Sequence, residues 1–79
     1  MENRKVTIYS TPSCPFCMMA KSFMKENNID FEDIDVSTDQ IKVQEMIQKS
    51  GQMAVPVIDI DSEIIVGFDK VKIRKALGL

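Results

Sequence analysis

Near the N-terminal end of this chain, the spacing of apolar residues changes sharply from a strand pattern to a helix pattern. Residues 5–9 alternate and are rich in β-branched side chains, a pattern typical of a β-strand. A proline at position 12 breaks the pattern, because the residue before a proline is disfavoured in the helical conformation. From position 14 to about 27 apolar residues recur at helical spacing, at Phe16, Met19, Ala20, Phe23 and Met24. The sequence therefore predicts a strand, a turn and a helix.

The rest of the chain continues this alternation. We predict a strand over 31–36, a helix from Ser37 or Thr38 to about Ser50, a hairpin over 57–60 and 63–66, and a helix from Asp69 to Leu77. The middle helix should end at Gly51 and point inward through Ile41, Val43, Met46 and Ile47. The order β-α-β-α-β-β-α predicts one α/β domain over residues 1–79. Its four-stranded mixed sheet should be flanked by helices, with a right-handed crossover in the βαβ unit.

Composition and charge narrow the class of protein. The chain of 79 residues has room for one core, and ten basic against twelve acidic residues argue against a nucleic-acid-binding surface. No apolar run approaches the roughly 18 residues of a membrane span. Residues 1–5 lead into the first strand without the apolar stretch of a signal peptide. We therefore expect a cytoplasmic monomer that binds neither nucleic acid nor membrane.

Two cysteines and no histidine restrict the possible chemistry. Without histidine the chain has neither a Cys–His pair nor a Ser–His–Asp triad, and a structural zinc site needs more ligands than two cysteines. We expect no metal site and no bound cofactor. The six methionines are interpreted as fillers of core gaps, and Asp33, Asp35 and Asp39 as part of a solvated face.

The two cysteines, Cys14 and Cys17, stand where the first strand gives way to the first helix. If Cys14 is the N-cap, Pro15 takes the first helical position, where its missing N–H costs nothing. The free N–H groups of the helix start then favour the thiolate form of Cys14, and Cys17, one turn later, is the natural resolving thiol. Two structural thiols, or half of an intermolecular zinc site, are the competing interpretations. The proline between the cysteines favours redox chemistry.

Three short motifs follow one another along the chain: Cys14-Pro15-Phe16-Cys17, Ala54-Val55-Pro56 and Gly67-Phe68-Asp69. Together they resemble the glutaredoxin family of the thioredoxin superfamily, whose motifs are Cys-Pro-Tyr-Cys, Thr-Val-Pro and a Gly-Gly turn before an acidic residue. The resemblance covers essentially the whole chain and implies a thioredoxin-like fold. It also implies an enzyme with Cys14 and Cys17 as catalytic residues. Glutathione would be the co-substrate and electron donor for reducing protein–glutathione mixed disulfides and protein disulfides.

The resemblance also implies a glutathione site. Pro56 would be a cis-proline that leaves the backbone of Val55 free to pair with a substrate, and Asp69 would meet the α-amino group of glutathione. Gly67 would allow close backbone approach, and two phenylalanines would form an apolar wall beside the sulfur. The full predicted site comprises Thr11, Phe16, Ala54, Val55, Pro56, Gly67, Phe68 and Asp69. From the residues alone, Asp69 is a helix N-cap, and Pro56 is either cis or an ordinary trans proline.

Three departures from the family pattern leave alternatives open. Thr11 stands three residues before Cys14, where the family commonly has Lys or Arg, Ala54 replaces a threonine, and Phe68 leaves only one glycine in the turn. Lys21 and Lys49 are candidates for a compensating cation, although Lys21 lies two helical turns beyond Cys14. One alternative is a glutaredoxin-like redoxin that is reduced by thioredoxin reductase and serves ribonucleotide reductase. The other is a non-enzymatic adaptor that binds a metal or an iron–sulfur centre in a dimer.

Overall fold

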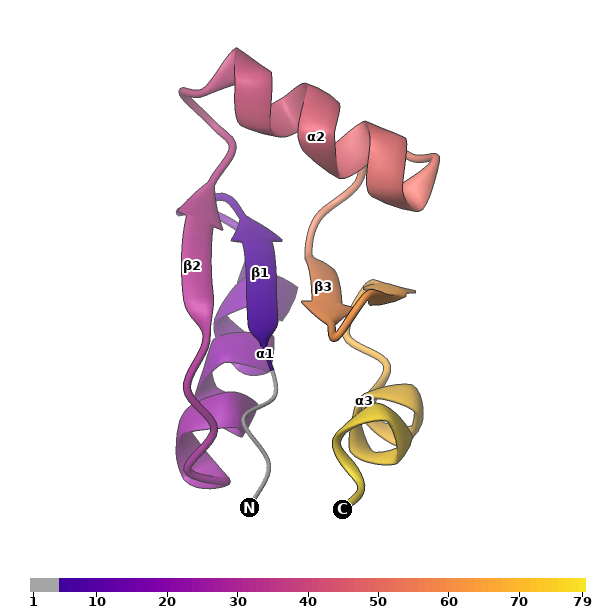
Figure 1. Ribbon diagram of the computed structural model, residues 1–79. Coiled ribbons are helices and arrows are strands. Elements are labelled where there is room, and N and C mark those ends of the chain that lie inside the picture. Colours follow the sequence, from indigo (N-terminus) through magenta and orange to yellow (C-terminus); the bar gives the residue numbers. More distant parts are fainter. Residues whose placement is uncertain (1–4) are drawn as a thin grey trace.

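A mixed four-stranded sheet organises residues 5–79, the part of the chain that the computed structural model describes (Figure 1). The elements are β1 (Val6–Ser10), α1 (Pro15–Glu26), β2 (Glu32–Asp35), α2 (Gln40–Ser50), β3 (Val57–Ile60), β4 (Glu63–Val66) and α3 (Lys70–Leu77). The strand order is β2-β1-β3-β4; β1 is parallel to β2 and antiparallel to β3, and β4 is antiparallel to β3. The predicted element order and α/β fold are confirmed. Residues 1–4, which belong to the segment expected not to be a signal peptide, lie outside the described residues.

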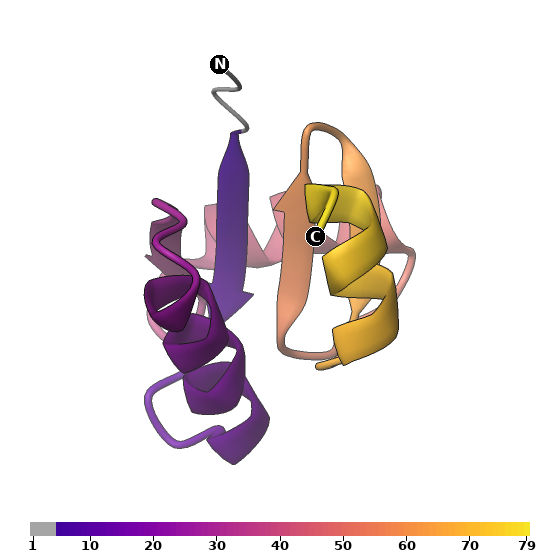
Figure 2. The ribbon, with the colours of Figure 1, turned by 90° about the horizontal axis from the view of Figure 1, so that it is seen from below.

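Helices cover both faces of the sheet. Because successive strand residues point to opposite faces, Ile8 and Tyr9 of β1 enter different cores. Ile8 belongs to the larger cluster, with Phe23 of α1 and Ile73 of α3, whereas Tyr9 packs with Met46 of α2. Figure 2 shows α1 and α3 in front of the sheet and α2 behind it. In Figure 1, α2 crosses near the carboxyl end of β1, so this end of the sheet lies close to both layers.

Capping residues define where the helices begin. Cys14 caps α1 with Pro15 at the first helical position, and Asp69 caps α3, both as predicted. The predicted cap of α2 is wrong. Asp39, not Ser37 or Thr38, accepts hydrogen bonds from the backbone N–H groups of Ile41 and Lys42, at 3.1 and 3.2 Å. Ser37 is instead engaged by Asp35, which accepts from both its backbone N–H and its hydroxyl.

The predicted inward faces of two helices need correction. Ile41 is 78% exposed, because at 3.6 residues per turn it lies across the helix from the inward-facing Val43, Met46 and Ile47. In α1 the buried face contains Cys17, while Phe16 and Met19 are exposed. Met24 and Met46 fill the core as predicted, but Met18, Met19 and Met53 are exposed. Even so, none of the helices within residues 5–79 combines the length and apolar character that crossing a membrane requires.

Replacing the α2 cap provides a direct test of this assignment. We expect Asp39→Ala to lower the free energy of unfolding by about 1 kcal/mol, because two backbone N–H groups lose their acceptor. The melting temperature should fall by about 4–8 °C for a chain of this size. Thr38→Ala is the matched control and should leave it almost unchanged. Equal losses in the two variants, measured by thermal circular dichroism, would contradict the assignment.

Candidate active site

The sulfur of Cys14 acts as the N-terminal cap of α1. It accepts a hydrogen bond from the backbone N–H of Cys17, with a sulfur–nitrogen distance of 3.2 Å. The backbone N–H of Cys14 donates to the carbonyl oxygen of Thr11 at 3.4 Å, which holds the turn before the helix. Pro15 has no N–H to leave unsatisfied at this position. The sulfur therefore lies at the positive end of the helix dipole.

The second thiol has the opposite environment. Cys17 is fully buried, and both cysteines are free thiols. Burial is the largest of the causes that raise the pKa of the Cys17 thiol to about 11, and its hydrogen bond with the Cys14 side chain is the next. The backbone of Thr11 and the charge of Lys21 act in the other direction but are smaller in effect. Near neutral pH, Cys17 therefore keeps its proton.

A second loop faces Cys14. The Val55–Pro56 peptide bond is cis, as the resemblance implied. The sulfur of Cys14 lies 4.0 Å from the carbonyl oxygen of Val55. The pairing of β1 with β3 ends at Val57, so Val55 lies just beyond the paired residues of the sheet. The structure thus brings the β1–α1 turn and the loop before β3 together around one sulfur atom.

The third predicted motif, Gly67-Phe68-Asp69, contacts the loop before β3 through one backbone hydrogen bond. The backbone N–H of Gly67 donates to the carbonyl oxygen of Pro56 at 2.8 Å. Gly67 has φ of 85°, a left-handed conformation that favours glycine, and no protein atom lies within 4 Å of the place a Cβ would take. Asp69 accepts from the backbone N–H of Lys72 at 3.2 Å, which confirms its role as a cap. A glutathione contact for either residue stays a prediction.

The two predicted phenylalanines have different surroundings. Phe16 is 59% exposed at the start of α1, two residues after Cys14. Phe68 is half-buried and packs edge-to-face on Phe23, with the ring centroids 6.2 Å apart. Packing against the core therefore explains why Phe68 is partly buried. Phe16 does not belong to either of the core clusters described above. An apolar wall made by both rings beside the sulfur stays a prediction.

An uncharged pocket of about 340 Å³ opens beside this site. It is lined by Thr11, Val36, Ser37, Val43, Met46, Met53, Ala54 and Val55. Sequence reasoning had placed Thr11, Ala54 and Val55 in a binding site but had missed the other five residues. Met53 is 78% exposed although it is apolar, and its position directly before the Ala54-Val55-Pro56 motif was the available signal.

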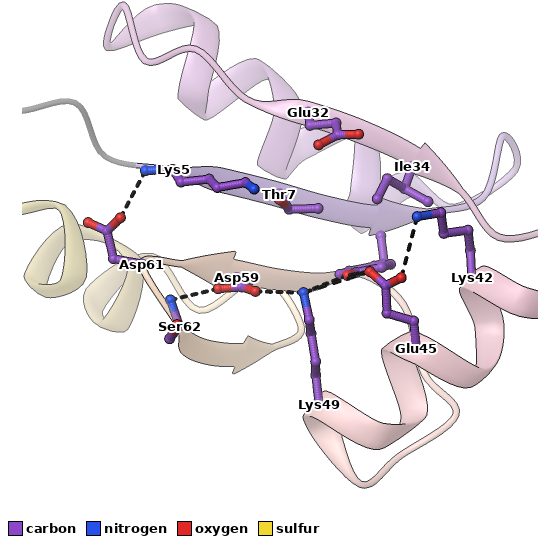
Figure 3. A pocket seen from close by; sticks show the side chains of 11 residues that line it. Lys5, Thr7, Glu32, Ile34, Lys42, Glu45, Lys49, Asp59, Asp61 and Ser62 are labelled. Carbon is purple, nitrogen blue, oxygen red and sulfur yellow. Dashed lines mark hydrogen bonds and ion pairs between the residues drawn. The ribbon is translucent and has the colours of Figure 1, made fainter.

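The two lysines considered as compensating cations are engaged by carboxylates. Lys21 forms an ion pair of 2.8 Å with Asp33. Lys49 lies in a separate polar pocket of about 580 Å³ on the α2 side of the sheet, where it forms an ion pair of 2.8 Å with Asp59 (Figure 3). Neither ion pair includes Thr11 or a cysteine. Thr11 itself carries no charge, and the only effect of either lysine on the dithiol described here is the small lowering of the Cys17 pKa by Lys21.

Several polar side chains that line this pocket are hydrogen-bonded to one another. Lys49 also donates to the hydroxyl of Tyr9 at 2.8 Å, and that hydroxyl donates to Glu45. Burial raises the pKa of Tyr9, while the hydrogen bond from Tyr9 lowers the pKa of Glu45. The hydrogen bond with Asp59 raises the pKa of Lys49. Despite these carboxylates, residues 5–79 contain no group of three or more histidine, cysteine or acidic side chains arranged to hold a metal ion.

This sheet order, with three helices and two cysteines at the start of α1, is that of the thioredoxin-like fold. Residues 6–65 match the sequence model of the glutaredoxin family, so the chain belongs to that family and is a glutaredoxin-like thiol oxidoreductase. A glutaredoxin-like 8.6 kDa protein of the rubredoxin operon of Clostridium pasteurianum, itself uncharacterized, is 49% identical over 72 residues, covering 91% of this chain and 96% of the relative.

Other relatives agree with this assignment. Glutaredoxin 3 of Escherichia coli is 34% identical over 73 residues, which cover 92% of this chain and 88% of that protein. The crystal structure of a glutaredoxin from Archaeoglobus fulgidus superposes with a TM-score of 0.87, covering 98% of this chain and 96% of that one. Its sequence is only 23% identical, so this likeness supports the fold alone.

The burial of Cys17 predicts unequal labelling of the two thiols. In the native reduced protein near neutral pH, iodoacetamide should modify Cys14 and leave Cys17 intact, because Cys17 is buried and stays protonated well below pH 11. Peptide mass spectrometry reads out each site, and adding denaturant should make both react. The Cys14→Ser variant should take up no label while folded. Rapid labelling of Cys17 in that folded variant would show that the burial described here is wrong.

Proposed function

We propose that the protein reduces protein–glutathione mixed disulfides and protein disulfides with glutathione as the electron donor. The observation that carries this proposal is the asymmetry of the thiols: the Cys14 sulfur accepts a helix N–H, whereas Cys17 is buried and protonated. Cys14 is then the attacking thiolate and Cys17 the resolving thiol. Membership of the glutaredoxin family supports this division of roles.

The first step transfers glutathione to the enzyme. The Cys14 thiolate attacks the glutathione sulfur of the mixed disulfide, and the new sulfur–sulfur bond forms as the bond to the substrate protein breaks. The substrate leaves as a thiolate and takes a proton from water. The N–H of Cys17 stabilises negative charge on Cys14 before the attack and again whenever Cys14 is the leaving group.

Release of glutathione then follows one of two routes. A second glutathione thiolate attacks the bound glutathione sulfur, which gives glutathione disulfide and regenerates the Cys14 thiolate. Alternatively, Cys17 loses its proton to the leaving glutathione thiolate and closes a disulfide with Cys14, which two further glutathione molecules reduce. Because burial raises the pKa of Cys17, the first route should dominate for small mixed disulfides.

The binding residues proposed for glutathione have different degrees of support. Val55 lies beside the Cys14 sulfur with its backbone beyond the sheet pairing, which suits main-chain pairing with the cysteinyl part of glutathione. Asp69 is the proposed partner of the α-amino group and already serves α3 as its cap. Thr11 and Ala54 line the neighbouring pocket without offering a charge.

The uncharged residue Thr11 favours a second candidate for the electron donor, thioredoxin reductase. Without a cation at Thr11, the glycyl carboxylate of glutathione lacks one partner, which supports reduction by thioredoxin reductase instead. A coupled NADPH-oxidation assay with a mixed-disulfide substrate separates the two, first with glutathione and glutathione reductase and then with thioredoxin reductase. Turnover in the first assay supports the proposal. Turnover in the second assay alone would replace glutathione as the donor.

The two cysteines should respond differently to substitution. Cys14→Ser should abolish all exchange, because the attacking sulfur is lost. Cys17→Ser should keep much of the activity on small glutathione mixed disulfides, since glutathione resolves the intermediate, and should lose reduction of protein disulfides. A deglutathionylation assay and an insulin-reduction assay measure the two activities. If Cys17→Ser is as inactive as Cys14→Ser in the first assay, the glutathione-resolved route is wrong.

A cation at position 11 should strengthen glutathione recognition. One charge at about 6 Å in an effective dielectric of about 20 contributes roughly 3 kcal/mol, and solvent exposure reduces this to about 1. Thr11→Lys should therefore lower KM for glutathione mixed disulfides about fivefold, and the gain should fade as salt is raised. Thr11→Val is the neutral control, and equal KM values for the two variants would show the position to be electrostatically silent.

A further inference from the structure

The uncharged pocket beside Cys14 is built from two layers of the fold. Val43 and Met46 of α2 line it together with Thr11 of the β1–α1 turn and Met53 of the loop after α2. Its volume of about 340 Å³ is at the lower end of the range for small-molecule sites, roughly 300–1,000 Å³. A pocket of this size fits an apolar side chain better than a whole peptide.

The pocket shares two residues with the surroundings of Cys14. Thr11 and Val55 both line it, and both also contact Cys14, through the 3.4 Å hydrogen bond to the Thr11 carbonyl and the 4.0 Å approach of the sulfur to the Val55 carbonyl. A molecule whose sulfur reaches Cys14 therefore presents its neighbouring group to the pocket.

The lining also selects by charge. None of its eight residues is charged, and the ion pairs of Lys21 and Lys49 lie outside it. A carboxylate placed here would lose hydration without gaining a partner, whereas an apolar side chain would gain contacts. Met53, 78% exposed at this site, is an unbranched and adaptable side chain suited to closing over an apolar group.

We infer that this pocket binds the apolar side chain next to the reacting cysteine in an extended segment of a disulfide-bonded substrate protein. The inference rests on the role proposed above for Cys14 and names the substrate class of that site. The segment pairs through its main chain with Val55, just beyond the last β1–β3 pair, as an added strand would. Peptides with an apolar neighbour should therefore exchange faster than peptides with a polar or acidic one.

Single-turnover exchange tests this preference without glutathione. Pre-reduced protein is mixed with a short peptide whose cysteine is disulfide-bonded to 2-nitro-5-thiobenzoate, with Leu, Ser or Glu next to that cysteine. The Cys14 thiolate attacks the peptide sulfur, a Cys14–peptide disulfide forms, and the coloured thiolate leaves with the electron pair of the broken bond. We expect the Leu peptide to react about tenfold faster than the Ser peptide, and the Glu peptide to be slowest.

Substitutions at the pocket should change the ratio of these rates. Met53→Gln should reduce the Leu-to-Ser ratio several-fold, Met53→Leu should restore it, and Val71→Gln, at an exposed apolar residue of α3 outside the pocket, should leave it unchanged. Thr11→Lys should raise the rate of the Glu peptide relative to the Leu peptide, because it places a cation in the lining. In a mixed disulfide trapped on a Cys17→Ala background, the Met46 and Met53 methyl resonances should shift with the Leu peptide only.

The outcomes distinguish a failure of the pocket assignment from a failure of the role proposed for Cys14. Equal rates for the Leu, Ser and Glu peptides would overturn the pocket assignment and leave the thiol exchange at Cys14 standing. A ratio that is preserved in Met53→Gln and Thr11→Lys would also overturn the assignment. If none of the peptides reacts, the proposed role of Cys14 fails and the inference fails with it.

Discussion

The hydrogen bond from the Cys17 N–H to the Cys14 sulfur is the interaction on which the site depends. A helix start needs an acceptor for its free N–H groups, and here the sulfur supplies it where serine or aspartate would ordinarily do so. The same geometry commits Cys17 to the buried face of α1, since it lies one turn further along. One local capping bond therefore accompanies two different environments, the helix start for Cys14 and the buried face of α1 for Cys17.

The pattern of the sequence was sufficient for most of the fold because its local signals agree with one another. Cys14-Pro15 at the start of one helix and Asp69 at the start of the last helix each combine a cap with a helical period, and both predictions were confirmed. The α2 start was mispredicted because Ser37, Thr38 and Asp39 are all good caps. Only the engagement of Ser37 by Asp35, a contact with the end of β2, decides among them.

The candidate site was predictable where a motif carries it and not where tertiary packing creates it. The approach of Val55 to Cys14 joins residues 41 positions apart, and the motif resemblance implied it. The pocket beside them depends on how α2 crosses the end of the sheet, which no local pattern specifies. Met53 illustrates the difference: composition suggested a core filler, whereas the fold leaves the side chain exposed beside the pocket.

The two faces of the sheet are held by different chemistry. On one face α1 and α3 pack mainly through an apolar cluster, beside the single ion pair of Lys21 with Asp33. On the other face α2 contacts β1 and β3 through Met46 and through a connected set of polar side chains, Tyr9, Glu45, Lys49 and Asp59. The reactive dithiol belongs to the first layer, and much of the pocket lining belongs to the second. Substitutions in α2 and its following loop can therefore alter the lining of the pocket while α1, which carries Cys17, keeps its own core contacts.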